Sequence, residues 1–262
     1  MNDSSGAPSF IDAHCHLSDE RVFSESVQLI HRAHQAGVMK IMLGGLEPDE
    51  WDRQIQLRTQ YPSLISTSFG LHPWWVEKLS DAEIARALSR LRVDGVQANA
   101  IGETGLDFHV KRDSARFGAQ RAAFLAQIEI AEGLKKPLVL HIVKAHAEAL
   151  SIVKYAKFKG PLMVHSFSGS IEEAREWMKL GALLSFSGGV LVPGKFLKVK
   201  AVIQSVPLNH LLLETDAPDQ GWREGFNEPS LIPELYQGVA SLLGVKLELL
   251  TQKLAENFRV FC

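Results

Sequence analysis

Two histidines near the start of the chain are spaced to bind one cation. They are His14 and His16, in the stretch Ile11-Asp12-Ala13-His14-Cys15-His16. Residues i and i+2 of a β-strand point to the same face, so both imidazoles face one ion while Cys15 points away. A His-x-His pair alone is a weak signal, because many such pairs have no chemical role. Its interpretation depends on what stands at the ends of the later predicted strands.

Further histidines and acids stand where other apolar runs of the chain end. After the first strand, these residues are His72, Glu103, His141, His165 and Asp216. Imidazoles and carboxylates together suit divalent cations such as zinc, manganese, magnesium, cobalt or nickel. One ion rarely takes more than six ligands, so we expect two divalent metal ions.

The two ions would share the ligands in a simple way. We expect one ion at His14, His16 and Asp216, and the other at His141 and His165, with Glu103 bridging the two. Two ions about 4 Å apart lower the pKa of a water and stabilise negative charge on a phosphate or carbonyl oxygen. Asp216 is the candidate general base that takes the proton from that water, and Glu103 is the second candidate catalytic residue.

The elements that position these side chains form an alternating pattern. Strands are expected at residues 10–16, 40–44, 64–71, 98–102, 137–141, 161–165, 182–186 and 210–213, and helices at 24–36, 48–59, 80–91, 113–133, 145–157, 170–180, 196–205, 230–243 and 247–258. Eight strands separated by helices predict an α/β protein with a single (β/α)8 TIM barrel, whose active site lies at the C-terminal strand ends. A doubly wound open sheet would more often have a glycine-rich turn where His14-Cys15-His16 stands.

Composition fits one globular enzyme. We expect a short leader over residues 1–9 and a single domain over 10–262, with hydrophobic residues at 46% and charged residues at 22%. The net charge of −2 provides no general basic field, so a nucleic acid would have to be held locally. The two cysteines are too few for a disulfide framework, which favours a cytoplasmic protein. No apolar run is long enough to span a membrane. We also expect the protein to be a monomer.

Six motifs in the expected order resemble the TatD family of metal-dependent hydrolases, within the amidohydrolase-like barrels. They are Ile11-Asp12-Ala13-His14-Cys15-His16, Gly70-Leu71-His72-Pro73, Gly102-Glu103-Thr104-Gly105-Leu106-Asp107, Leu140-His141, Val164-His165-Ser166-Phe167-Ser168-Gly169 and Leu213-Glu214-Thr215-Asp216-Ala217-Pro218. The last motif, followed by Asp219, is most similar to the YjjV-type branch. The resemblance implies a (β/α)8 barrel that hydrolyses DNA phosphodiesters, commonly from the 3′ end of single strands. The family's metal ligands fall on His14, His16, Glu103, His141, His165 and Asp216.

The chain departs from the family pattern after the fifth strand. Val143 stands where the family usually has an arginine, and Lys144 follows it. Lys144 would replace a phosphate-binding arginine only in part, because an ammonium lacks the planar fork of a guanidinium. His72 and Asn227 also match family positions, and His72 would either reach a substrate phosphate or make a structural hydrogen bond.

Substrate class stays open at this point. The same ions would polarise the carbonyl of an ester, amide or lactone, for example the ester between a D-amino acid and tRNA.

Asp107 is expected to orient a neighbour of Glu103. Trp74 and Trp75 would either stack on an unpaired base or pack on a helix. The lysines at 195, 198 and 200 form a basic cluster that we interpret as a solvated face.

Overall fold

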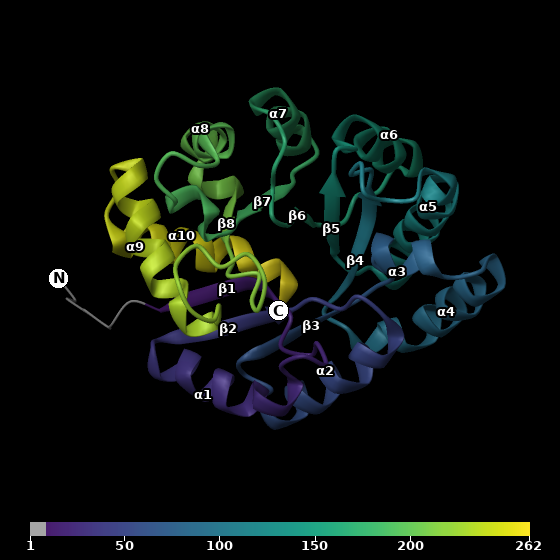
Figure 1. The fold of residues 1–262 in the computed structure, drawn as a ribbon, viewed down its shortest axis with the longest axis horizontal. Helices are drawn as coiled ribbons and strands as arrows, with labels where there is room; N and C mark the ends of the chain where they lie inside the picture. Colours follow the sequence, from purple (N-terminus) through teal and green to yellow (C-terminus); the bar gives the residue numbers. More distant parts are fainter. Residues whose placement is uncertain (1–8) are drawn as a thin grey trace.

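Eight parallel strands form a barrel with helices around it (Figure 1). The computed structural model describes residues 9–262, so all but the last residue of the expected leader lies outside the described residues. The strands are β1 (Phe10–Cys15), β2 (Val38–Leu43), β3 (Ile65–Phe69), β4 (Ala100–Asp107), β5 (Leu138–Val143), β6 (Leu162–Val164), β7 (Leu183–Phe186) and β8 (Leu211–Leu213). They pair in chain order, which confirms the predicted (β/α)8 architecture.

The circle closes between the segments that follow β8 and β1. The backbone N–H of His16 donates to the carbonyl of Ala217 at 2.7 Å, and that of Asp216 donates to the carbonyl of His14 at 3.0 Å. Residues about 200 positions apart in sequence therefore lie side by side, as Figure 1 shows for β1 and β8. This closure brings Asp216 beside the two histidines of the first strand.

Helices follow the strands around the outside. They are α1 (Ser26–Gln35), α2 (Pro48–Gln60), α3 (Pro73–Lys78), α4 (Asp81–Asp94), α5 (Phe117–Leu134), α6 (His146–Ala156), α7 (Ile171–Lys179), α8 (Leu197–Ser205), α9 (Ile232–Leu243) and α10 (Leu247–Phe258). Capping boxes begin α4 at Ser80 and Glu83 and α7 at Ser170 and Glu173, because each serine and glutamate bonds the other's backbone N–H. Within residues 9–262, no helix has the length and apolar character needed to cross a bilayer.

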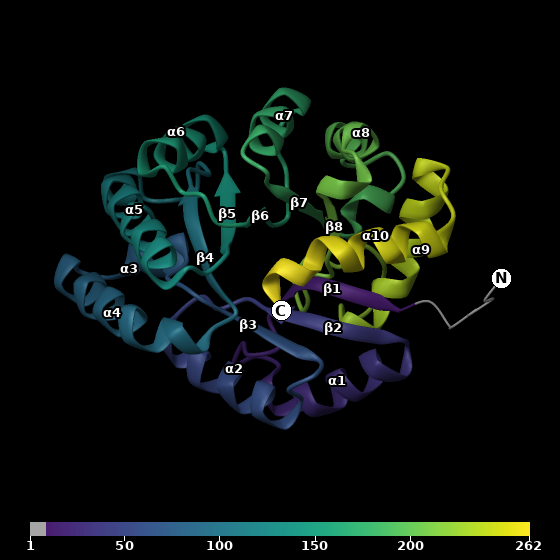
Figure 2. The ribbon, with the colours of Figure 1, turned by 180° about the vertical axis from the view of Figure 1, so that it is seen from behind.

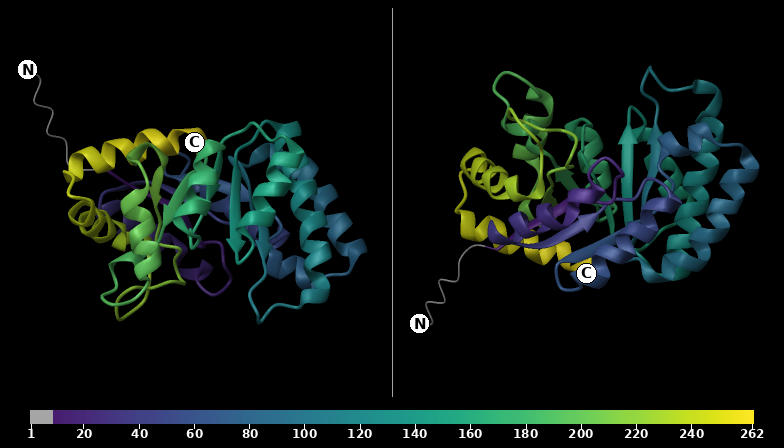
Figure 3. Two further views of the ribbon diagram at one scale, coloured as in Figure 1. Left: turned by 90° about the horizontal axis from the view of Figure 1, so that it is seen from above. Right: turned by 60° about the horizontal axis from the view of Figure 1, so that its bottom comes forward.

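The barrel is closed at one end and open at the other. Seen from behind, α10 crosses the ring of strands (Figure 2), and Phe258 and Phe261 pack against the inward-facing side chains of several strands. The loops that follow β1 and β8 lie at the opposite end (Figure 3, left). The C-terminal ends of the strands therefore surround the accessible mouth, where the sequence places the candidate site.

Two strands are longer than the sequence pattern predicts. β4 continues to Asp107 and β5 to Val143, with Gly105 paired to His141. A Cβ at Gly102 would lie 2.3 Å from the carbonyl oxygen of Val139, and one at Gly105 would lie 2.1 Å from that of His141. Only glycine permits this close approach of the two backbones. Glu103 therefore lies within a strand and not in a loop after it.

Candidate metal centre

A cavity of about 540 Å³ opens at the C-terminal ends of the strands. We call it the polar cup, because its wall includes His16, Glu103, His141, His165 and Asp216, which come from β4 and β5 or directly follow β1, β6 and β8. His14 is completely buried beneath it. The structure thus brings all six predicted metal ligands to one place.

Glu103 lies at the centre of this group with one oxygen toward each half. Its Oε1 is 3.1 Å from His14 Nε2 and 3.3 Å from His16 Nε2. Its Oε2 is 2.7 Å from His165 Nε2 and 3.6 Å from His141 Nδ1. The two oxygens of one carboxylate therefore face two separate pairs of imidazole nitrogens.

Asp216 completes the half of the cup that contains the first-strand histidines. Its Oδ1 is 3.2 Å from His16 Nε2 and 4.0 Å from His14 Nε2. Asp12 holds the preceding residue in place, because Thr215 donates its backbone N–H to Asp12 Oδ1 at 2.8 Å and its hydroxyl to Oδ2 at 2.5 Å. Asp216 has a φ of 53°. This left-handed conformation is uncommon outside glycine and occurs more often at functional sites.

Several buried polar atoms of the cup have no hydrogen-bond partner among residues 9–262. They include His14 Nε2, Glu103 Oε1 and Asp216 Oδ1. A buried, unpaired polar atom costs about 1–3 kcal/mol, so a group of them facing one another fits the donor set of a cation. Nitrogen and oxygen ligands about 2.1 Å from a common cation lie about 3.0–3.4 Å apart. Separations of 3.1–3.3 Å among most of these donors match that spacing.

The second half of the cup passes the same test. His141 Nδ1 and His165 Nε2 are 3.1 Å apart and both face Glu103 Oε2. The remaining ring nitrogens of these histidines face carboxylates, because His141 Nε2 is 3.6 Å from Asp107 Oδ2 and His165 Nδ1 is 3.6 Å from Glu214 Oε1. A proton held on the carboxylate side leaves the lone pair of the opposite nitrogen free for a cation.

The electrostatics of the cup favour positive charge. Burial alone would raise the pKa of Glu103, but His165 and His14 hold it well below its usual value. Burial likewise opposes ionisation of Asp216, yet hydrogen bonding from His16 and the nearby imidazoles lower its pKa to about 2. Burial alone would lower the pKa of His16, but Glu103 and Asp216 raise it to about 10. The carboxylates of Glu103 and Asp216 thus stabilise positive charge on the neighbouring imidazoles, and they would stabilise a bound cation in the same way.

His72 lines the cup and lies close enough to Glu103 and His141 to share a cation with them. Its Nδ1 accepts a hydrogen bond from the backbone N–H of Trp74 at 3.1 Å, so we assign the ring proton to Nε2. That nitrogen is 3.7 Å from Glu103 Oε2. Burial and the neighbouring His141 hold the pKa of His72 well below its usual value. His72 thus makes a structural hydrogen bond, which is one of the two predicted alternatives, and its Nε2 faces the cup. Its contact to a substrate phosphate stays a prediction.

The other two predicted substrate-binding residues lie outside the wall of the cup. Val143 lines the cup, but the adjacent Lys144 does not and is exposed. Asn227 is buried, and its side-chain amide donates to the carbonyls of Thr215 at 2.8 Å and Asp219. Asn227 thus fixes the loop after β8. Substrate binding by Lys144 and Asn227 stays a prediction.

The aromatic pair after His72 belongs to α3, a short helix that the sequence pattern does not predict. Trp74 lines the cup and donates its indole N–H to Asp107. The guanidinium of Arg112 lies 4.3 Å from the centre of the Trp74 ring, which leaves that face covered. Trp75 packs against the apolar core. Of the two predicted alternatives, packing describes both rings better than an open stacking platform.

Arg21 and Gln220 are among the residues of the cup that were not singled out from the sequence. Arg21, in the loop after β1, lines the cup and forms ion pairs at 2.7 Å with both Asp19 and Asp219. Gln220, in the loop after β8, donates to Asp216 Oδ2 at 2.5 Å. Both lie in loops at strand ends, which is the signal that could have identified them. Their partners depend on two loops that meet only in the folded chain.

Comparison with known proteins gives consistent matches along the chain. Residues 11–262 match the family described as TatD related DNase. An uncharacterized metal-dependent hydrolase, YjjV of Escherichia coli K12, is 30% identical with 95% of each chain covered. A 3′-5′ ssDNA/RNA exonuclease TatD of Dickeya dadantii is 31% identical over 95% of this chain and 96% of the relative. The crystal structure of the YjjV protein superimposes with a TM-score of 0.85 at 29% identity, covering 96% of this chain and 97% of that one.

Proposed function

We propose that this chain, which belongs to the TatD-related DNase family and is a metal-dependent hydrolase of ester bonds, removes nucleotides from the 3′ end of single-stranded DNA using two divalent ions. The observation that supports this proposal most is the position of Glu103 between two groups of donors. His14, His16 and Asp216 would hold one ion, and His141 and His165 the other. Such ions supply Lewis-acid polarisation of a phosphoryl group and lower the pKa of a water molecule.

The side chains of the cup divide the remaining work. Asp216 would be the general base, because its Oδ1 lies among the donors of the first ion, where an attacking water would be held. Gln220 donates to Asp216 Oδ2 and thereby fixes the plane of that carboxylate. His72 Nε2, which faces the cup, would donate to a non-bridging phosphate oxygen. Together these groups orient the phosphodiester and take up the proton that hydrolysis releases.

Hydrolysis of a carboxylic ester or lactone is the alternative activity. Val143 favours ester or lactone hydrolysis, because its branched apolar side chain lines the cup where the TatD family usually has an arginine that could bind phosphate. A carbonyl substrate does not need that cation. The two activities predict different products and are separated by one screen.

The screen uses metal-reconstituted protein and substrates of both classes. Single-stranded DNA labelled at the 5′ end, duplex DNA, single-stranded RNA and simple aryl esters and lactones are incubated with the protein. We expect stepwise shortening of single-stranded DNA from its 3′ end, with no comparable turnover of the esters. His165→Ala should abolish shortening through loss of a metal ligand, and Asp216→Asn through loss of a ligand and the base. Ester turnover without any shortening would instead support the alternative.

A further inference from the structure

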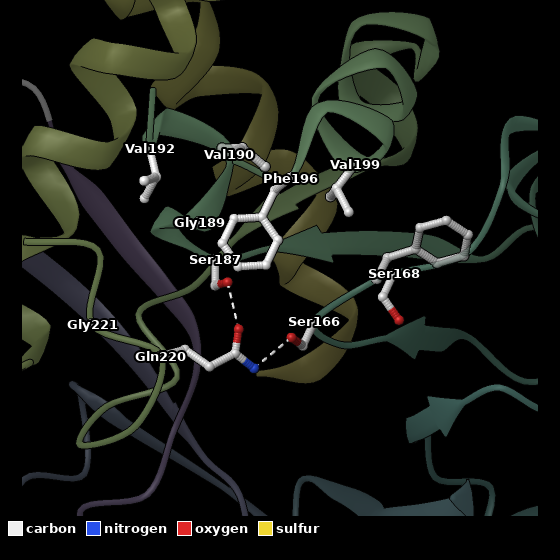
Figure 4. A pocket seen from close by; sticks show the side chains of 11 residues that line it. Ser166, Ser168, Ser187, Gly189, Val190, Val192, Phe196, Val199, Gln220 and Gly221 are labelled. Carbon is white, nitrogen blue, oxygen red and sulfur yellow. Dashed lines mark hydrogen bonds between the residues drawn. The ribbon is translucent and has the colours of Figure 1, made fainter. Parts of the chain in front are cut away.

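A second cavity of about 160 Å³ adjoins the polar cup (Figure 4). We call it the apolar cleft, because Val190, Val192, Phe196 and Val199 form much of its wall. It lies among the segments that follow β6, β7 and β8. Ser166, Ser168 and Gln220 line both the cleft and the cup. A ligand anchored in the cup would therefore extend directly into the cleft.

Gln220 forms the polar boundary between the two cavities. Its Nε2 donates to Asp216 Oδ2 at 2.5 Å and to Ser166 Oγ at 2.6 Å, and its Oε1 accepts from Ser187 Oγ at 2.7 Å. Figure 4 shows this amide crossing the floor of the cleft below the Phe196 ring. The cleft is thus one side chain away from the proposed general base. Its occupant would be the part of the substrate next to the scissile bond.

Phe196 gives the cleft an aromatic wall that is largely open. The side chain is 56% exposed, although it is one of the larger apolar residues. Its φ of 51° is unusual for a bulky residue. A Cβ built on Gly189 would lie 3.4 Å from two ring carbons, so the ring rests against that glycine. Exposed aromatic rings beside a positively charged groove are the surfaces on which unpaired bases stack.

Three lysines lie within four residues of Phe196 in the sequence. Lys195 and Lys198 are exposed and flank Phe196 in sequence, and Lys200 follows in the first turns of α8. Within residues 9–262, the lysines paired with carboxylates are Lys154, Lys179 and Lys253. Lys195, Lys198 and Lys200 form no salt bridge within residues 9–262, so their charges are available to a polyanion that reaches Phe196.

The size of the cleft matches one flat ring system. An apolar cavity of about 150 Å³ is known to take up a benzene ring. The hydroxyls and amide at its floor add the polar groups that the edge of a nucleobase would contact. A duplex end would present two paired bases and does not fit.

We propose that the apolar cleft receives the base of the 3′-terminal nucleotide, stacked on Phe196, while Lys195 and Lys198 face the phosphates of the strand. This inference rests on the proposed function, because it assigns the position of the nucleotide that the cup releases. It also explains a preference for single strands, since a paired base cannot enter.

The test compares Phe196→Ala with Tyr155→Ala, a removal of an exposed aromatic ring on α6 that lies away from the cleft. Each metal-loaded protein is given an oligonucleotide with a normal or an abasic 3′-terminal nucleotide. An abasic third nucleotide serves as the substrate control. We expect kcat/KM of Phe196→Ala to fall about fivefold or more on the normal strand, as loss of base stacking requires. On the strand with the abasic terminus, Phe196→Ala and the wild type should be equal.

Two further variants keep the outcome interpretable. Phe196→Trp should retain the preference for a terminal base, because it keeps an aromatic ring, and equal activity of Phe196→Ala and the wild type on the abasic strand excludes misfolding. Replacing both Lys195 and Lys198 by alanine should lower the slope of log Kd against log salt by about 0.7 for each phosphate that the lysines no longer neutralise. Lys159→Ala, an exposed lysine before β6 at the closed end, should leave the slope unchanged.

Different experimental results would contradict the inference about the cleft and the proposed function. If the wild type shortens single strands but Phe196→Ala retains the full preference for a terminal base, the inference about the cleft is wrong and the proposed function stands. If the wild type neither binds nor shortens single strands, both are wrong. Equal salt slopes for the double lysine variant and the wild type would remove the proposed role of the lysines.

Discussion

Removal of the Asp107 carboxylate should lower the affinity of the protein for one metal ion and leave its affinity for the other unchanged. Asp107 Oδ2 is 3.6 Å from His141 Nε2 and keeps the proton on that side of the ring. With the proton there, His141 Nδ1 offers its lone pair to the cup. Asp107 contacts none of the donors around His14 and His16. Asp107 also accepts from the indole of Trp74, so the perturbation reaches Trp74 and His141 but not the donors around His14 and His16.

The magnitude follows from what each substitution leaves behind. Asp107→Ala removes the acceptor of the His141 proton, and loss of such partners costs about 10–100-fold in metal affinity. Asp107→Asn can still accept with one oxygen but has lost its charge, so we expect about tenfold. In Asp107→Asn, the side-chain oxygen can face His141 only if the NH2 group faces the backbone N–H of His109. In the wild type that N–H donates to Asp107 Oδ1 at 2.9 Å.

The assay is competition between the protein and a coloured chelator, which resolves the two binding steps. Asp113→Asn is the matched control, because Asp113 lies in the loop that follows β4 and accepts a backbone hydrogen bond at 2.9 Å without contacting a histidine of the cup. One binding step should weaken in the order wild type, Asp107→Asn, Asp107→Ala. Equal weakening of both steps in a folded protein, or no weakening in Asp107→Ala, would refute the reasoning.

Two further predictions concern close packing and pH. A Cβ at Gly44 would lie 2.4 Å from His14 Cε1, so Gly44→Ala should displace His14 and lower kcat/KM about 100-fold, whereas Gly118→Ala, with no atom near its Cβ, should not. Burial lowers the pKa of His146 to about 4. Below pH 6.5 the unfolded chain therefore binds a proton that the folded chain excludes, so the free energy of unfolding decreases as the pH is lowered. Urea unfolding should show the wild type losing about 2 kcal/mol more than His146→Gln between pH 7 and pH 5. Parallel losses in both proteins would contradict this.

The barrel and the residues of the cup could be predicted from the sequence for one physical reason. Parallel strands buried on both sides end abruptly at polar residues, and the C-terminal ends of all strands meet at one mouth. His14, His165 and Asp216 stand at such ends, so their convergence needed no knowledge of the loops. The capping boxes that begin α4 and α7 are local signals and were predictable in the same way.

Other features depend on contacts between distant segments. The extension of β4 follows from the close approach of its backbone to β5 at Gly105, which becomes visible only when the two strands are paired. The partners of Gln220 come from segments that follow β6, β7 and β8. Loops of this kind have no periodic pattern, so no spacing in the sequence connects Gln220 to Ser166 or Ser187.

The position of Glu103 between two cations is the central claim. Anomalous diffraction from crystals soaked in a manganese salt tests it most directly. The account predicts two peaks about 3.5–4 Å apart on either side of the Glu103 carboxylate, one beside His14 and His16 and the other beside His141 and His165. A single peak, or peaks outside the polar cup, would contradict it.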